Sequence, residues 1–188
     1  MNWRYKEFRI LLNKIYFCVL PFSTMRSRWL KKHDIFQSCG EQFFFQPRKI
    51  PMEPKLIKFG NNVKIAANVT FVTHDAIHLM LREIDSKDSV QHLGCIEVGD
   101  NVFIGAGTFV LPNVKIGSNV IIAAGAIVTN DVEDGIIVGG NPARKIGDFE
   151  ALKNRRNAET ELIRKSSVSR IEYEWTKFYI KHAENKYK

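Results

Sequence analysis

The stretch IEVGDNVFIGAGTFVLPNVKIGSNVIIAAGAIVTNDV, residues 96–132, repeats one pattern every six residues. From Val98 onward every sixth residue is aliphatic: Val98, Ile104, Val110, Ile116, Ile122 and Val128. Three places after each lies a residue type that tolerates a left-handed backbone: Asn101, Gly107, Asn113, Asn119, Gly125 and Asp131. Such a period predicts a solenoid of short strands and tight corners, with three strands per coil and interior residues stacked 18 positions apart, as in Ile104 over Ile122.

The same period occurs upstream and breaks at a histidine. Phe59, Ile65 and Phe71 are six residues apart, and their corner positions hold Asn62, Asn68 and then His74. The next interior position holds Asp75, whose carboxylate could enter an apolar core only at a large desolvation cost. We therefore predict that the chain leaves the coil over residues 76–95 and that this excursion loop is functional.

Composition and charge limit the class of protein. The 188 residues are 45% apolar, and the three cysteines, Cys18, Cys39 and Cys95, form no CxxC pair, which favours a reducing compartment over a disulfide framework or a structural zinc site. Lys and Arg outnumber Asp and Glu by 12 to 4 in residues 1–58 and by 10 to 7 in 148–188, whereas residues 59–147 have 6 against 9. The basic excess flanks an acidic middle and accompanies no nucleic-acid motif, so we expect no nucleic-acid partner.

The hexapeptide units, the break at THD (73–75) and the closing VGGNPARKIG (138–147) resemble the left-handed β-helix acyltransferases of the hexapeptide-repeat superfamily. The nearest group includes galactoside, maltose and xenobiotic acetyltransferases and the O-acetyltransferases of bacterial capsule and lipopolysaccharide synthesis. The resemblance implies an all-β fold, a left-handed parallel β-helix over residues 35–147. An N-terminal helical segment, 1–34, and a C-terminal helical tail, 148–188, are expected to flank it.

The resemblance also implies a reaction and its residues. His74 matches the catalytic histidine, a general base for acetyl transfer from acetyl-CoA to a hydroxyl, or an amine, of a sugar or saccharide intermediate. Asp75, beside it, is a candidate acceptor contact. The positions that match coenzyme contacts are Ala106, Ala124, Thr129 and Arg144, and Asn130 is a further candidate, although family members often carry Lys or Arg at that position. Arg144 and Lys145 directly follow GGNP (139–142) and Ala143, and two cations there suit the phosphates of the coenzyme's nucleotide. No metal is expected, and the active sites are expected between the chains of a homotrimer.

Two other functions fit parts of the pattern. A metal enzyme like the γ-class carbonic anhydrases would use His74, His78 and His92 as ligands. A non-catalytic interaction protein would keep the solenoid as a scaffold. Bound zinc would favour the first, and failure to bind acetyl-CoA would favour the second.

The N-terminal segment has basic residues around a short apolar run, Ile15–Phe22, which is far below the roughly 20 residues that span a bilayer. It is expected to form an amphipathic helix that packs on the protein or on a sister subunit, or that rests on an anionic membrane surface. The expected location is therefore the cytoplasm, with the inner face of the cell membrane as the alternative.

Overall fold

The fold was analysed in a computed structural model, which describes residues 15–85 and 88–184. The first 14 residues of the expected N-terminal segment and the last four of the tail lie outside the described residues. The chain divides into two compact units, residues 1–149 and 150–188.

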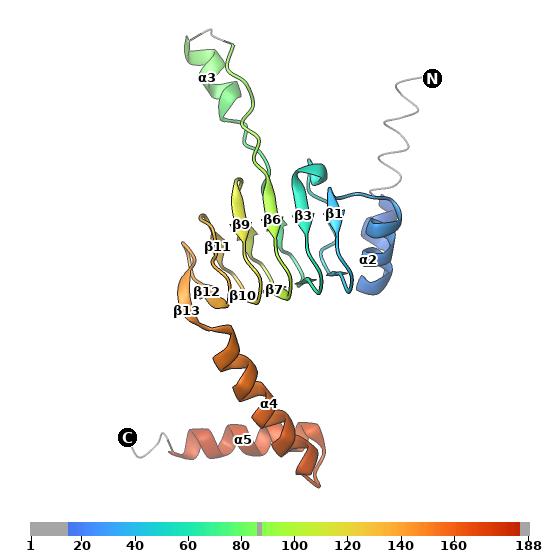
Figure 1. Cartoon of the computed structure of the whole chain (residues 1–188), viewed down its shortest axis with the longest axis vertical. Coiled ribbons are helices and arrows are strands. Elements are labelled where there is room, and N and C mark those ends of the chain that lie inside the picture. The colour runs from blue at the N-terminus through green and yellow to red at the C-terminus, as the bar shows by residue number, and fades with distance from the viewer. Residues whose placement is uncertain (1–14, 86–87, 185–188) are drawn as a thin grey trace. The chain divides into compact units, whose positions relative to one another are not determined.

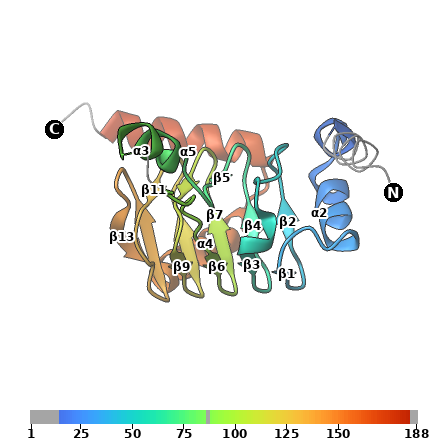
Figure 2. The same ribbon diagram turned by 90° about the horizontal axis from the view of Figure 1, so that it is seen from above.

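The first unit is a coil whose three sides are three sheets (Figures 1 and 2). The first sheet contains β1 (Ser38–Cys39), β3 (Ile57–Phe59), β6 (Ile96–Val98) and β9 (Val114–Ile116). The second contains β2 (Phe44–Phe45), β4 (Lys64–Ile65), β7 (Val102–Ile104), β10 (Val120–Ile122), β12 (Ile136–Gly139) and β13 (Arg144–Asp148). The third contains β5 (Thr70–Phe71), β8 (Phe109–Val110) and β11 (Ile127–Val128).

The repeat positions the core as predicted. Ile104 pairs in parallel register with Ile122, 18 residues later, and the six aliphatic residues of the repeat are all at most 2% exposed. Phe59 pairs with Val98 across 39 positions, so the excursion inserts 21 residues into one coil of 18. The parallel three-sided β-helix is thus confirmed.

The corners use left-handed residues at most of the predicted positions. Positive φ angles occur at Asn62, Asn68, Asn101, Gly107, Asn113, Asn119 and Gly125. The prediction was wrong for Asp131 and His74, which do not have positive φ. Asp131 Oδ1 instead accepts a hydrogen bond from the Lys115 backbone N–H at 2.7 Å, and His74 forms an antiparallel β-bridge with Leu93. A bridge needs extended backbone, which removes the requirement for a left-handed corner.

The excursion is a helical arm and not an irregular loop. At the base of the arm, its outgoing and returning segments are joined by the His74–Leu93 bridge and by a 2.8 Å hydrogen bond from the Gly94 N–H to the Thr73 carbonyl. Beyond the base lies α3 (Ile77–Asp85), which stands clear of the coil (Figure 1). The side chains of Ile77, Leu79, Met80 and Ile84 are each more than half exposed.

The described part of the N-terminal segment packs on the first coil. Residues 15–19 are helical and α2 spans Ser23–Lys32. Phe17 is fully buried, with its ring centroid 6.2 Å from that of Phe45 in β2, and Ser27 Oγ accepts the Phe45 N–H at 2.7 Å. Packing on the protein, the first of the expectations for this segment, is therefore observed, and no described helix is long and apolar enough to cross a membrane.

The coil ends in a strand. Residues 144–148 form β13, which pairs antiparallel with β12 at the edge of the second sheet. The added strand satisfies the hydrogen-bonding groups that the edge of β12 would otherwise expose. The tail, expected to be helical, contains two helices, α4 (Phe149–Lys165) and α5 (Arg170–Glu184).

Candidate active site

His74 lies at the base of the arm, just after β5, where the outgoing and returning segments of the excursion begin to pair. Its side chain is 23% exposed, and its Nδ1 lies 2.7 Å from Oε2 of Glu53. The contact is not a linear hydrogen bond, since Nδ1 has no aligned partner. Catalytic hydrogen bonds are often poorly aligned before substrate binds, so this geometry does not rule out His74 as a base.

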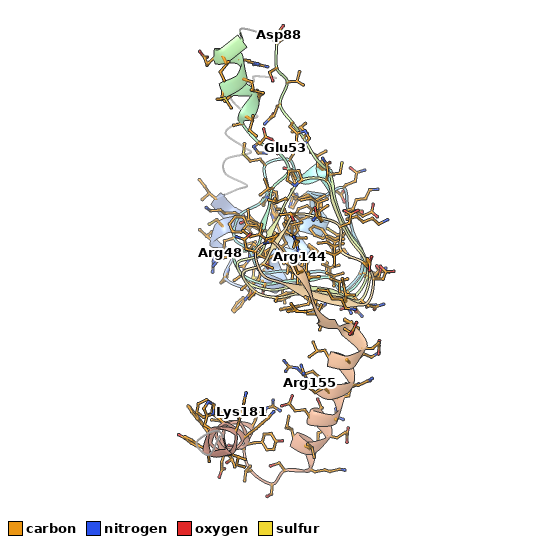
Figure 3. The ribbon with its side chains drawn as sticks, turned by 90° about the vertical axis from the view of Figure 1, so that its left-hand side faces the viewer. Arg48, Glu53, Asp88, Arg144, Arg155 and Lys181 are labelled. Atoms are coloured by element: carbon orange, nitrogen blue, oxygen red, sulfur yellow. The ribbon has the colours of Figure 1, made fainter. Side chains whose placement is uncertain are left out.

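Glu53 comes from the preceding coil. It precedes a short 3-10 helix, η1 (Pro54–Leu56), which leads directly into β3. The same Oε2 atom accepts a 2.7 Å hydrogen bond from the hydroxyl of Thr73, a residue that is 1% exposed. The side chains of Glu53, Thr73 and His74 therefore form one connected polar group. Figure 3, in which the coil is seen end-on, shows Glu53 at the base of the arm and Asp88 at its tip.

A pocket of about 270 Å³ adjoins His74. Its walls are the segment 49–52, which belongs to the first coil, and the segment 69–74, which contains β5. The walls are mainly apolar, and Lys49 is their only Lys or Arg. A small acceptor could enter here beside the imidazole.

Asp75, expected as an acceptor contact, has a structural role in the arm. Its Oδ1 accepts a 3.0 Å hydrogen bond from the N–H of Ile77, the first residue of α3. A carboxylate at this position satisfies one of the unpaired N–H groups at the start of a helix. The interaction accounts for the aspartate where the chain leaves the coil, and contact with an acceptor remains a prediction.

The three histidines of the metal-enzyme alternative are not gathered as ligands. Within residues 15–85 and 88–184, no group of three or more His, Cys, Asp or Glu side chains could hold a metal ion. His92 Nε2 instead lies 3.5 Å from the side-chain nitrogen of Asn113. The described chain therefore offers no ready-made zinc site of the kind that this alternative requires.

The corner between the second and third sheets, called the bare corner below, carries only the small residues Ala and Gly on two neighbouring coils. Ala106 and Ala124 are exposed there on neighbouring coils, and the Gly125 N–H donates to the Ala106 carbonyl at 2.8 Å. Gly107 and Gly125 have φ angles of +72° and +73°, and a Cβ atom at either would meet nothing within 4 Å. The absence of bulk leaves backbone open to an extended ligand such as a pantetheine arm.

The other predicted coenzyme residues lie elsewhere on the coil. Thr129 and Asn130 follow β11 and are exposed at the opposite end of the third sheet, the end at which His74 follows β5. Arg144 and Lys145 are exposed on β13, where Lys145 Nζ lies 2.6 Å from Asp148 Oδ1. Within one chain, therefore, the predicted site residues do not form a single cluster.

Comparison with known proteins identifies the family. The family model described as bacterial transferase hexapeptide (six repeats) matches residues 96–130. Protein CapG of Staphylococcus aureus is 43% identical over 138 residues, which cover 72% of this chain and 76% of CapG. The putative acetyltransferase YvoF of Bacillus subtilis is 35% identical over 143 residues, which cover 75% of this chain and 77% of YvoF.

The chain belongs to the hexapeptide-repeat acetyltransferase family. Membership makes it an acetyltransferase, as the resemblance implied. A galactoside acetyltransferase solved in complex with coenzyme A shares the fold, with a TM-score of 0.52 and 24% identity over 73% of this chain and 80% of that one.

Sequence reasoning did not find Glu53, the partner of the acetyltransferase's histidine. Glu53 precedes His74 by 21 residues, one coil of 18 plus three. The segment PRKIPMEPK around it has no hexapeptide period, so its position relative to β5 could not be read from the repeat. A search for carboxylates about one coil before the histidine would have found Glu53 as a candidate.

Proposed function

We propose that this acetyltransferase moves the acetyl group of acetyl-CoA to a hydroxyl of a sugar or saccharide intermediate, with His74 as the general base. The observation that carries the proposal is the partly exposed imidazole at a pocket, with one ring nitrogen against a carboxylate. An amine acceptor would use the same chemistry, and the acceptor hydroxyl is favoured by the O-acetyltransferase resemblance.

The step balances without a metal or a covalent enzyme intermediate. The free ring nitrogen of His74 takes the acceptor's hydroxyl proton as the acceptor oxygen attacks the thioester carbonyl. The tetrahedral oxyanion then collapses, the C–S bond breaks, and the imidazolium returns the proton to the departing thiolate. Backbone N–H groups would hold the oxyanion, as they do in other acyl transfers. Burial raises the pKa of the Cys39 thiol to about 11, so this cysteine is a poor nucleophile at neutral pH.

The separation of the site residues supports an active site between chains. Ala106 and Ala124 lie at one end of the third sheet and His74 at the other, and we propose that a coenzyme on the bare corner of one chain meets the histidine of a neighbour. We propose a left-handed coil assembled as a homotrimer, with the pantetheine arm along Ala106 and Ala124. Thr129 and Asn130 would line the coenzyme's path, and Arg144 and Lys145 would face its phosphates.

The proposal is tested by incubating the protein with acetyl-CoA and panels of sugars, sugar nucleotides, lipid-linked saccharides, antibiotics and amines. Acetylated products should be detected by mass, because the exposed Cys18 and Cys95 would react with thiol reagents. We expect O-acetylation of a saccharide that depends on His74. Exclusive N-acetylation, or binding of acetyl-CoA without transfer to any acceptor, would contradict the proposed reaction.

A further inference from the structure

We propose that Glu53 is the positioning residue of His74, and that it holds the imidazole as the tautomer with the proton on Nδ1 and the lone pair on Nε2. This inference rests on the proposed function, because it assigns the nitrogen that accepts the acceptor's proton. Glu53, a residue of the first coil, would thus orient the histidine at the start of the arm.

The contacts single out one carboxylate oxygen. Glu53 Oε2 lies 2.7 Å from His74 Nδ1 and 2.7 Å from the hydroxyl of Thr73. Thr73 must donate to this oxygen, since an ionised carboxylate can only accept. The same carboxylate has no proton to donate to Nδ1 either, so the 2.7 Å approach favours the ring proton on Nδ1, although the two groups are not aligned as a linear hydrogen bond.

Charge pairing elsewhere does not explain Glu53. Among the ion pairs of the described residues, Glu53 appears only with His74 and with no Lys or Arg. The side chain is 30% exposed, so an unpaired carboxylate would be free to turn toward water. Its orientation toward His74 is instead held by buried Thr73, whose hydroxyl bonds to the same oxygen.

The backbone that carries Glu53 is fixed. The Leu56 N–H donates to the Glu53 carbonyl at 3.0 Å, and Pro54 begins the short helix with a restricted φ. Lys55 Nζ donates to the Phe36 carbonyl at 3.0 Å, which ties η1 to the first coil. A preorganised carboxylate loses little entropy when it aligns with the ring, as a positioning residue requires.

The arrangement has two chemical consequences. A carboxylate at Nδ1 leaves the Nε2 lone pair as the only proton acceptor of the ring. It also stabilises the imidazolium that forms when the acceptor proton arrives, without taking that proton itself. Loss of the carboxylate should therefore lower turnover more than coenzyme binding.

The test compares Glu53→Gln and Glu53→Asp with a matched control, Glu97→Gln, which removes a carboxylate that lies between Lys58 and Lys115 on the first sheet. In Glu53→Gln, kcat is expected to fall about 10- to 100-fold with the KM for acetyl-CoA within about twofold. The kcat of Glu53→Asp should lie between that of Glu53→Gln and that of the unmutated protein, and the kcat of Glu97→Gln should equal that of the unmutated protein.

The tautomer is measured without turnover. Long-range ¹H–¹⁵N spectra of protein labelled with ¹⁵N-histidine report which ring nitrogen carries the proton, and the His74→Asn spectrum assigns the signals. We expect the Nδ1–H form in the unmutated protein and loss of that preference in Glu53→Gln. Should Glu53→Gln fail to fold, Thr73→Val removes the hydroxyl that orients the carboxylate, with Thr73→Ser as its control.

The outcomes separate the two proposals. An Nε2–H form in the unmutated protein, or an unchanged tautomer in folded Glu53→Gln, would overturn the role of Glu53 even if the protein acetylates a saccharide. An Nδ1–H form that depends on Glu53 would support the role even if no saccharide is acetylated, in which case only the proposed acceptor class fails.

Discussion

At the scale of single residues, the two cations of β13 differ in their partners. Arg144 donates from Nη1 to the Ala143 carbonyl at 2.9 Å and pairs with no carboxylate of the described residues, whereas Lys145 pairs with Asp148. An anion such as a coenzyme phosphate would therefore gain more from Arg144, whose charge is uncompensated and whose planar guanidinium can bind two oxygens at once.

Arg144→Ala is expected to raise the KM for acetyl-CoA about tenfold with little change in kcat, because a charge-assisted contact contributes about 1.5–3 kcal/mol when well formed and less under solvent screening. Steady-state kinetics at varied acetyl-CoA concentration measure the effect. Lys145→Ala is the matched control and should change KM by less than about threefold. Equal KM values for Arg144→Ala and the unmutated enzyme would move the phosphates away from β13.

At the scale of elements, the corners form a continuous column. The side-chain nitrogen of Asn62 donates to Asn101 Oδ1, and that of Asn101 donates to Asn119 Oδ1, both at 3.0 Å. Each of these residues has a φ between 55° and 56°. The column therefore combines a left-handed conformation with hydrogen bonds that connect successive coils.

Asn101→Ala should lower the free energy of unfolding by roughly 2 kcal/mol, since it loses both hydrogen bonds and adds left-handed strain of about 1 kcal/mol. Asn101→Gly loses the same bonds but tolerates the positive φ, and should cost roughly half as much. Denaturant unfolding of both variants compares the two contributions. Stability of Asn101→Ala equal to that of Asn101→Gly would remove the conformational part of this explanation.

The sequence predicted the elements in which a single local requirement selects the residue type. A narrow interior admits aliphatic residues such as Ile104, and a left-handed corner selects Asn101 or Gly107, so both columns were visible in the repeat. The extended backbone of His74 was missed because its bridge partner, Leu93, lies across a 21-residue insertion. Glu53 and β13 were missed for the same physical reason, since each depends on contacts between segments that share no period.

At the scale of the whole molecule, the proposed trimer makes each active site the property of two chains. His74 and the bare corner at Ala124 lie at opposite ends of the third sheet, which fits this division. Light scattering should therefore give three times the chain mass at micromolar concentration, and a monomer would remove the basis for a shared site.

Mixed assemblies test the sharing itself. His74→Asn removes the base, and Ala124→Trp should fill the exposed corner, so each variant alone is expected to be inactive. Unfolded together and refolded as mixed trimers, the two should recover activity, because random assembly leaves about a quarter of shared sites with both parts intact. A mixture no more active than its components would place the base and the coenzyme corner of each site on one chain.

The turnover of His74→Asn tests most directly whether His74 is the base. An asparagine amide can occupy the place of Nδ1 and keep the contact with Glu53 while removing Nε2. We predict a folded trimer that binds acetyl-CoA normally and transfers acetyl groups about 10²–10⁴ times more slowly. A folded His74→Asn trimer with near-normal acetyl transfer to its acceptor would contradict the catalytic assignment.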